Sequence, residues 1–239
     1  MRLDKFLAEV GVGTRTEVKK IIKKKQILVN GETALKPEMK INENSDVIEY
    51  NGNIIKYQKY YYYLLNKPAG CVTALKDNMF KTVMDCLDSD IRKIKGFAPV
   101  GRLDKDTEGL LLLTNDGQLT HHLLSPAHHV SKKYYAKLDK KVENDSIELF
   151  EKGIDIGDDK PTLPSKLEIL EDGYSAYLTI TEGRFHQVKR MFKAVGCEVI
   201  YLKRVQMGKV TLDGLDIGEY RELTPEEIDM LSQNMKKRN

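Results

Sequence analysis

The sequence has no tryptophan, only three cysteines, and no apolar run near the roughly 20 residues that a membrane-spanning helix needs. Cys71, Cys86 and Cys197 stand alone, without a C-x-x-C pair, so neither a disulfide framework nor a thiolate zinc site is indicated. The sequence also contains neither a G-x-G-x-x-G run nor a P-loop, the glycine-rich signatures of nucleotide binding. We therefore expect no membrane helix and no nucleotide cofactor.

Histidines are the remaining candidate metal ligands. His121-His122 and His128-His129 are two pairs on either side of Ser125-Pro126. Adjacent residues point about 100° apart on a helix and in opposite directions on a strand, so neither pair supplies two converging ligands. We predict no metal site.

Positive charge is concentrated at the start of the chain. Residues 1–25 contain eight Lys or Arg against three acids, whereas residues 26–239 contain 31 against 33. A basic segment on a nearly neutral body is typical of contact with nucleic acid or another anionic surface. The opening Met1-Arg2-Leu3-Asp4 leads into an acid-containing amphipathic pattern rather than a signal-peptide core, so we expect a cytoplasmic protein.

The basic segment has the pattern of two short helices. Apolar residues recur at helical spacing between Leu3 and Val10, Gly11-Val12-Gly13 breaks the pattern, and Thr14-Arg15-Thr16-Glu17 offers a capping box for a second helix. The polar surface of that second helix is almost entirely basic, which favours phosphate contacts over a merely solvated face. The residues predicted to bind phosphate are Arg15, Lys19, Lys20, Lys23 and Lys24.

Two strand patterns follow the helices. Ile27–Gly31 and Val47–Gly52 are β-rich runs that end in Asn-Gly, a dipeptide favoured in tight hairpin turns. The sequence therefore predicts a helix-helix-hairpin module. The expected organisation is a small module at residues 1–55, a linker at 56–59, a larger domain at 60–232 and a basic tail at 233–239.

The larger domain is organised around a charged loop that runs into a buried strand. Gly101–Gly109 carries five charged residues between two glycines, and the four leucines that follow suit an interior strand. A carboxylate beside an apolar wall, such as Asp104, is typical of catalytic acids and nucleophiles. Two alternatives are a structural ion pair or turn with Arg102, and the Mg²⁺ site of a metal-dependent nuclease, formed with Asp106 and Glu108.

Strand and helix patterns alternate irregularly through the rest of the chain. They predict an α+β fold in which the larger, strand-rich domain has a mainly antiparallel sheet. Strands are expected at 60–65, 110–114, 134–138, 167–170, 177–180, 199–202 and 210–212, and helices at 117–124, 146–152, 186–195 and 225–231.

Several blocks of the sequence, in this order, resemble pseudouridine synthases of the ribosomal RNA type. They are the loop run G-R-L-D-K-D-T-E-G-L-L-L-L-T-N-D-G, then K-K-Y, then E-G-R-F-H-Q-V-K-R-M, and then L-K-R. N-K-P-A-G at 66–70 is similar to the turn that opens the family's catalytic domain, where Lys67 would contact RNA or simply belong to the turn. Residues 1–31 resemble the alpha-L RNA-binding domain.

The resemblance implies a set of site residues. Asp104 would be the catalytic residue, Tyr134 would pack on a base flipped out of the RNA stack, and Lys189 would keep Asp104 ionised. Because related branches have arginine at the position of Lys189, a charge pairing is expected here rather than a bidentate fork. The other residues expected to contact substrate are Arg102, Arg184, which would hold a phosphate or the loop, and Leu202, which would form an apolar wall.

The implied function is isomerisation of one uridine of small-subunit 16S rRNA to pseudouridine, without a cofactor or a metal. E-G-R-F-H-Q-V-K-R-M-F together with S-P-A-H-H indicates the small-subunit branch of the family. The alternatives are a large-subunit 23S rRNA synthase and a non-catalytic rRNA-binding assembly factor. The implied partner is 16S rRNA or a small-subunit assembly intermediate, and we expect a monomer.

Overall fold

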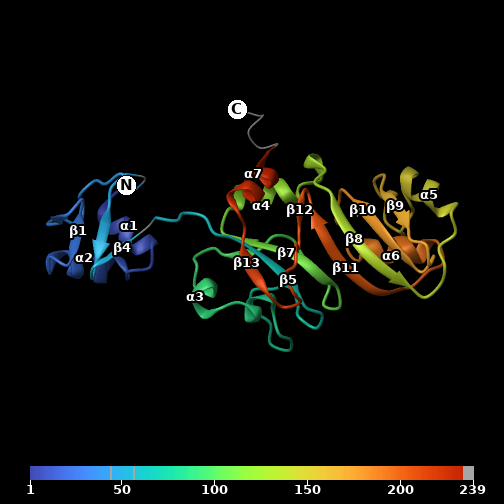
Figure 1. Cartoon of the computed structure of the whole chain (residues 1–239), viewed down its shortest axis with the longest axis horizontal. Helices are drawn as coiled ribbons and strands as arrows, with labels where there is room; N and C mark the ends of the chain where they lie inside the picture. Colours follow the sequence, from blue (N-terminus) through green and yellow to red (C-terminus); the bar gives the residue numbers. More distant parts are fainter. Residues whose placement is uncertain (44, 56, 234–239) are drawn as a thin grey trace. The chain divides into compact units, whose positions relative to one another are not determined.

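The computed structural model describes residues 1–43, 45–55 and 57–233, and the chain forms two compact units (Figure 1). The first unit runs from Met1 to Lys59, and the second begins at Tyr60. Apart from Gln233, the predicted basic tail lies outside the described residues. Within the described ranges, no helix is long and apolar enough to cross a membrane.

The first unit begins with the two predicted helices, α1 (Leu3–Glu9) and α2 (Arg15–Lys23). The Thr14 hydroxyl accepts a hydrogen bond from the Glu17 backbone N–H, and the Glu17 carboxylate accepts one from the Thr14 backbone N–H. This reciprocal pair is the predicted capping box, and it satisfies two donors that the start of a helix leaves free. The two helices pack over a buried core that includes Leu3, Phe6, Leu7, Val18, Ile22, Ile27, Val29 and Ile48.

Four short strands complete the first unit in the order β2-β1-β3-β4, and every pair is antiparallel. Asn30-Gly31 and Asn51-Gly52 have positive φ at all four residues, as the predicted hairpin turns require. The expected hairpin is therefore part of a small sheet. Its strands are β1 (Ile27–Val29), β2 (Glu32–Thr33), β3 (Ile48–Tyr50) and β4 (Asn53–Ile55).

One residue of the expected linker packs on the first unit. The ring of Tyr57 stacks on Phe6, with 5.6 Å between the ring centroids, and its hydroxyl donates to Glu9 Oε2 at 3.1 Å. The contacts of the first unit therefore extend beyond residue 55.

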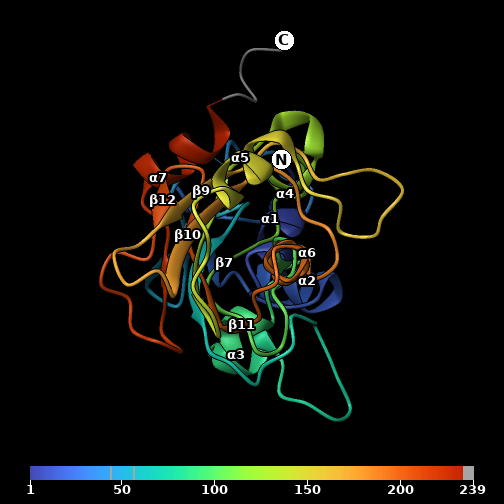
Figure 2. The same cartoon turned by 90° about the vertical axis from the view of Figure 1, so that its right-hand side faces the viewer.

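The second unit is built on a nine-stranded sheet in the order β13-β5-β7-β11-β8-β10-β9, with β6 pairing with β7 and β12 with β11 (Figure 1). Figure 2 views this unit from the end at which β9 and β10 lie. Every pair is antiparallel except β7 with β11. This topology confirms the α+β class and the mainly antiparallel sheet. The strands are β5 (Tyr62–Lys67), β6 (Ala98–Pro99), β7 (Glu108–Thr114), β8 (Lys132–Leu138), β9 (Lys166–Ile169), β10 (Ser175–Ile180), β11 (Val199–Met207), β12 (Val210–Thr211) and β13 (Tyr220–Glu222).

Hydrophobic cores cover both faces of this sheet. Leu111 and Leu113 of β7 belong to the core that includes α6, whereas Leu110 and Leu112 belong to the core that includes α4 and α7. Successive residues of a strand point to opposite faces, so four consecutive leucines are all buried only when both faces are covered. The helices are α3 (Ser89–Arg92), α4 (Gly117–Leu124), α5 (Ser146–Lys152), α6 (Gln187–Ala194) and α7 (Pro225–Ser232), with 3-10 turns at Val83–Cys86 and Pro126–His128.

Several strands differ from the sequence expectation: β7, β8 and β10 begin two residues earlier than expected, and β6 was not predicted. β5 includes Asn66 and Lys67, which were expected to lie in the following turn. These two polar side chains are buried in the strand because each donates a hydrogen bond to a backbone carbonyl. β11 continues past residue 202 to Met207. β13 was not predicted, since Tyr220–Glu222 is too short to give a periodic pattern.

Candidate active site

A cavity of about 420 Å³ lies in the second unit, beside the charged loop. Its walls come from residues 101–107 of that loop, from β8 and β11, and from residues 183–189 at the start of α6. These segments are far apart in the sequence and meet because β11 lies between β7 and β8 in the sheet. The predicted site residues that line the cavity are Arg102, Asp104, Tyr134, Arg184, Lys189 and Leu202.

The charged loop is held in place by a buried lysine. Lys67 is fully buried at the end of β5, and its ammonium group donates to the carbonyls of Pro68, Lys105 and Thr107 at 3.1, 3.3 and 2.8 Å. Burial lowers the pKa of Lys67, a cost that hydrogen bonds to the charged form offset. Lys67 therefore binds the loop backbone, and it belongs to the strand rather than to a simple turn.

The end of the loop requires a glycine. Gly109 has φ of +102°, and a Cβ atom at this position would lie 2.2 Å from the Arg204 carbonyl oxygen. Gly109 is the residue that pairs with Arg204 where β7 and β11 run parallel. The absence of a side chain thus lets the loop and the β11 wall of the cavity come together.

Asp104 lies in the cavity among basic groups. Its side chain is 29% exposed, and its carboxylate oxygens lie 3.3 Å from Lys189 Nζ and 3.5 Å from His186 Nε2. Lys189 is closer to a second carboxylate, that of Asp106, at 2.6 and 2.8 Å. The expected charge pairing with Asp104 is therefore present, but Lys189 is shared between two acids. Among the described residues, Asp104 forms no ion pair with Arg102.

Asp106 and His186 are further parts of this site; from the sequence, His186 was assigned no role in it, and Asp106 only that of a ligand in the magnesium alternative. Burial tends to raise the pKa of Asp106, but the hydrogen bond and charge of Lys189, helped by His186, outweigh burial and lower that pKa. His186 adopts a left-handed conformation, with φ of 49°, immediately before α6. The Asp-x-Asp spacing was the available signal for Asp106, because a tight turn brings alternate side chains to one cation.

The carboxylates do not gather as the magnesium alternative requires. Glu108 already belongs to β7, where it accepts a hydrogen bond from the Tyr201 hydroxyl at 2.7 Å. In the part of the chain that the structure describes, no group of three or more histidine, cysteine, aspartate or glutamate side chains is arranged to hold a metal ion.

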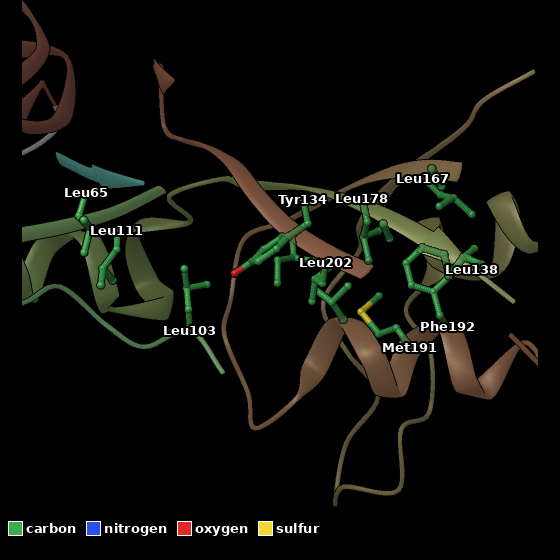
Figure 3. Close-up of a cluster of buried hydrophobic side chains, with 14 of the residues drawn as sticks. Leu65, Leu103, Leu111, Tyr134, Leu138, Leu167, Leu178, Met191, Phe192 and Leu202 are labelled. Carbon is green, nitrogen blue, oxygen red and sulfur yellow. The ribbon is translucent and has the colours of Figure 1, made fainter. Parts of the chain in front are cut away.

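Tyr134 and Leu202 form an apolar wall of the cavity. Tyr134 is 8% exposed and Leu202 is 5% exposed. Figure 3 shows the Tyr134 ring beside Leu202, with its hydroxyl directed toward the side where Leu103 lies. A flat aromatic ring next to an aliphatic side chain is a surface on which a planar base can stack.

The two predicted arginines differ in their surroundings. Arg102 is exposed at the cavity and, within the described ranges, has no ion-pair partner. The Arg184 guanidinium donates to Glu182, to Asp158 and to the carbonyls of Lys160 and Pro161. Its donors are thus taken up by the protein, so these contacts favour the loop-holding role of Arg184 over phosphate binding.

Two further cations, Lys132 and Arg204, line the cavity, and the sequence reading gave neither a role. Lys132 is 6% exposed and Arg204 is 2% exposed. Burial, together with the charge of Arg204, lowers the pKa of Lys132 to about 8. Strand alternation was an available signal, because Lys132 precedes Tyr134 by two residues and Arg204 follows Leu202 by two.

In the first unit, the basic residues of α2 form an exposed surface. Its apolar side is buried through Val18 and Ile22, so the lysines between these positions point outward. Among the described residues none of these cations forms an ion pair, which leaves them available to an anionic partner. The exposed residues are Arg15, Lys19, Lys20, Lys23 and Lys24.

The two units correspond to two known families. Residues 61–194 match the family model described as RNA pseudouridylate synthase, and residues 1–47 match the S4 domain. The first match covers more than half of the chain. The chain therefore belongs to the RNA pseudouridylate synthase family, which confirms the family expected from the sequence.

Relatives align along nearly the whole chain. A protein of Bacillus subtilis (strain 168) named uncharacterized RNA pseudouridine synthase YtzG is 45% identical over 98% of this chain and 99% of its own length. The ribosomal small subunit pseudouridine synthase A of Haemophilus influenzae is 42% identical over 97% of this chain and 99% of its own length. A crystal structure of a pseudouridylate synthase, 40% identical, covers 97% of this chain and 99% of its own, with a TM-score of 0.68.

The lowered pKa of Lys132 predicts a pH-dependent stability. The Lys132 ammonium loses its proton near pH 8 in the folded protein and near pH 10.5 in the unfolded chain. Burial of the charged ammonium therefore lowers the free energy of unfolding below pH 8, and this loss of stability disappears as the pH rises from 8 to 10.5. Lys132→Met should therefore stabilise the protein more at pH 7 than at pH 9.5. The difference in melting temperature should shrink by roughly 3–6 °C, from a penalty on the order of 1.5 kcal/mol.

Differential scanning calorimetry of both proteins across this range measures the effect. Lys137→Met, on the exposed side of the same strand, is the control and should show a difference that does not change with pH. A constant difference for Lys132→Met would mean that the Lys132 ammonium keeps an ordinary pKa.

Proposed function

We propose that this protein isomerises one uridine of small-subunit 16S rRNA to pseudouridine, with Asp104 as the catalytic residue. The observation that carries the proposal is the position of the Asp104 carboxylate, which lines the same cavity as the Tyr134 and Leu202 wall. The small-subunit substrate is supported by the names of relatives, including the ribosomal small subunit pseudouridine synthase A of Escherichia coli (strain K12), 42% identical over 95% of this chain.

The reaction requires few functional groups, and the cavity supplies them. Isomerisation breaks the bond between uracil N1 and ribose C1′, turns the base, and forms a bond from C5 to C1′, so no atom enters or leaves the molecule. The Asp104 carboxylate, which lies beside Lys189, would attack C1′, attack C6 of the base, or take a ribose proton to give a glycal. The Tyr134 ring would hold the base while it turns.

The first unit would bind the RNA. Its match to the S4 domain and the exposed cations of α2 support contacts to phosphate groups rather than to individual bases. A monomer that meets 16S rRNA or an assembling small subunit in the cytoplasm would fit this division. A non-catalytic assembly factor needs only the first unit, and it leaves the cavity and its carboxylate without a role.

Asp104→Asn should abolish isomerisation and leave RNA binding within about twofold of the wild-type value. The amide keeps the shape of the side chain but acts neither as a nucleophile nor as a base, so the rate should fall to about one thousandth or less. Release of tritium from C5 of labelled uridine in 16S rRNA measures the reaction. Asp159→Asn, an exposed residue outside the cavity, is the control.

Pseudouridine mapping of total rRNA tests the substrate. Cells that lack the gene should lose one modified position in 16S rRNA, which the wild-type gene restores and Asp104→Asn does not. Loss of a 23S rRNA position would instead select the large-subunit alternative, and turnover by Asp104→Asn near the wild-type rate would refute the assignment of Asp104.

Lys189 should affect the reaction more than RNA affinity. Lys189→Ala removes the cation beside Asp104, so the single-turnover rate at saturating RNA should fall by about 10²-fold with little change in Kd. Lys189→Arg keeps the charge and should retain much of the rate. Lys193→Ala, exposed on the same helix, is the control, and equal losses of rate and affinity in Lys189→Ala would argue against a charge partner for Asp104.

The cations of α2 should govern RNA affinity and its salt dependence. Replacing Lys19, Lys20, Lys23 and Lys24 together with Gln should weaken binding to unrelated RNA sequences alike, and each lost phosphate contact should reduce the log-log salt slope by about 0.7–0.9. Filter-binding titrations at several salt concentrations measure both quantities. The charge-matched control replaces the exposed residues Lys93, Lys95, Lys140 and Lys152 of the second unit.

The rate on bound RNA separates two roles of the first unit. If it only holds the substrate, the single-turnover rate at saturating RNA should stay at the wild-type value in the quadruple α2 variant. A collapse of that rate would show that the first unit also positions the target uridine, and an unchanged salt slope would remove α2 from the RNA interface.

A further inference from the structure

Two positive charges are buried in the cavity wall without an acidic partner. Arg204 donates from Nε to the Leu110 carbonyl at 2.7 Å, but its Nη2 has no hydrogen-bond partner among the described residues. In the part of the chain that the structure describes, Lys132 donates only to the carbonyl of Val130, at 2.9 Å. Within the described ranges, neither cation forms an ion pair.

Such an arrangement is unfavourable for folding. A buried cation loses its hydration, and an unpaired buried donor costs about 1–3 kcal/mol. Well-packed apolar residues in place of buried charges are often neutral or stabilising. Lys132 and Arg204 therefore need an explanation other than stability, and their place in the cavity wall points to a ligand with negative charge or carbonyl oxygens.

The two cations lie next to the surface on which the base would stack. Lys132 and Tyr134 are two residues apart on β8, so their side chains share a face of the sheet. Arg204 is the direct partner of Tyr134 on the neighbouring strand β11, and Leu202 lies two residues before it. The carboxylate of Asp104 reaches the cavity from a different segment, the loop.

We propose that Lys132 and Arg204 form a subsite for the carbonyl oxygens of the flipped uracil and stabilise the negative charge that the base acquires during the reaction. This inference rests on the proposed function. It adds two substrate-contacting residues to that function and gives them a charge-stabilising task.

The bond changes require such a site. When the N1–C1′ bond breaks, its electron pair stays on the base, which becomes a uracil anion with charge shared by N1, O2 and O4. At the same time C1′ bonds to the Asp104 carboxylate or forms a glycal double bond by losing the 2′ proton to it. The base then turns, C5 bonds to C1′, the C5 proton moves to N1, and the carboxylate is released with any borrowed proton returned to C2′.

A buried cation interacts most strongly with the base when the base becomes negatively charged. In the alternative attack on C6, the π electrons of the C5–C6 bond move toward O4, so charge again gathers on a carbonyl oxygen. Fixed donors in a water-poor cavity stabilise developing charge more than water does, because they are already oriented. The two cations stabilise the neutral bound base less than the charged one. Their removal should therefore lower the rate of isomerisation rather than the affinity for RNA.

Single-turnover kinetics at saturating RNA test the proposal. Lys132→Met should slow isomerisation by about 10²- to 10³-fold while Kd for RNA stays within about twofold and the melting temperature at pH 7 does not fall. Lys132→Arg, which keeps the charge, should recover a substantial part of the rate. Lys137→Met, exposed on the same strand, should match the wild type.

Binding of two small ligands tests the charge preference without turnover. Barbiturate has the ring of uracil with a third oxygen and is an anion at neutral pH, so it mimics the charged base. Wild-type protein and Asp104→Asn should bind barbiturate about tenfold or more tightly than uracil, and Lys132→Met and Arg204→Met should lose most of this preference. Isothermal titration calorimetry measures both ligands.

The outcomes separate the possible failures. A wild-type rate in Lys132→Met, or a preference for barbiturate that survives both Met variants, would overturn the subsite and leave Asp104 as the catalytic residue. A loss of RNA affinity that equals the loss of rate and depends on salt would assign the two cations to a backbone phosphate instead. No isomerisation of 16S rRNA by the wild type would reject the proposed substrate, and the barbiturate preference would still report on the cavity.

Discussion

The geometry of the site depends on one buried ammonium group. Lys67 lies at the end of β5 and donates to three carbonyls of the chain around it, two of them in the charged loop. Without this cation the Pro68 and Thr107 carbonyls would lose a donor and the Lys105 carbonyl would keep the Gly70 N–H, so a loop of alternating charges would have less reason to take one conformation. The position of Asp104 is therefore fixed through the backbone, which leaves its carboxylate free to make contacts inside the cavity.

Positive and negative charges are unevenly distributed in the cavity. Asp104 and Asp106 face Lys189, whereas Lys132 of β8 and Arg204 of β11 form no ion pair within the described ranges. Acids at one wall and unpaired cations at another suit a ligand that reacts at its sugar and gathers charge on its base. The same cavity would cost less to fold if it were apolar, so its polarity reflects a compromise between stability and chemistry.

Much of this architecture could be predicted from the sequence, because its signals are local. Asn-Gly turns, the Thr14–Glu17 capping box and the leucine run each depend on residues that are close in the chain. The contacts of Lys189 with Asp106, the saturation of Arg184 and the burial of Lys67 could not be predicted, since each depends on segments that meet only after folding. The surroundings of these charged residues were predicted incompletely, because a charged residue in a sequence normally indicates an exposed position.

The sharing of Lys189 between two carboxylates has a consequence for the whole course of the reaction. In the proposed reaction Asp104 loses its negative charge when it forms a bond or takes a proton, and a lysine that depended on it alone would then be an isolated cation in a partly buried site. Asp106, at 2.6 Å, keeps Lys189 neutralised at that moment. The second acid thus leaves Lys189 with a carboxylate partner throughout the proposed reaction.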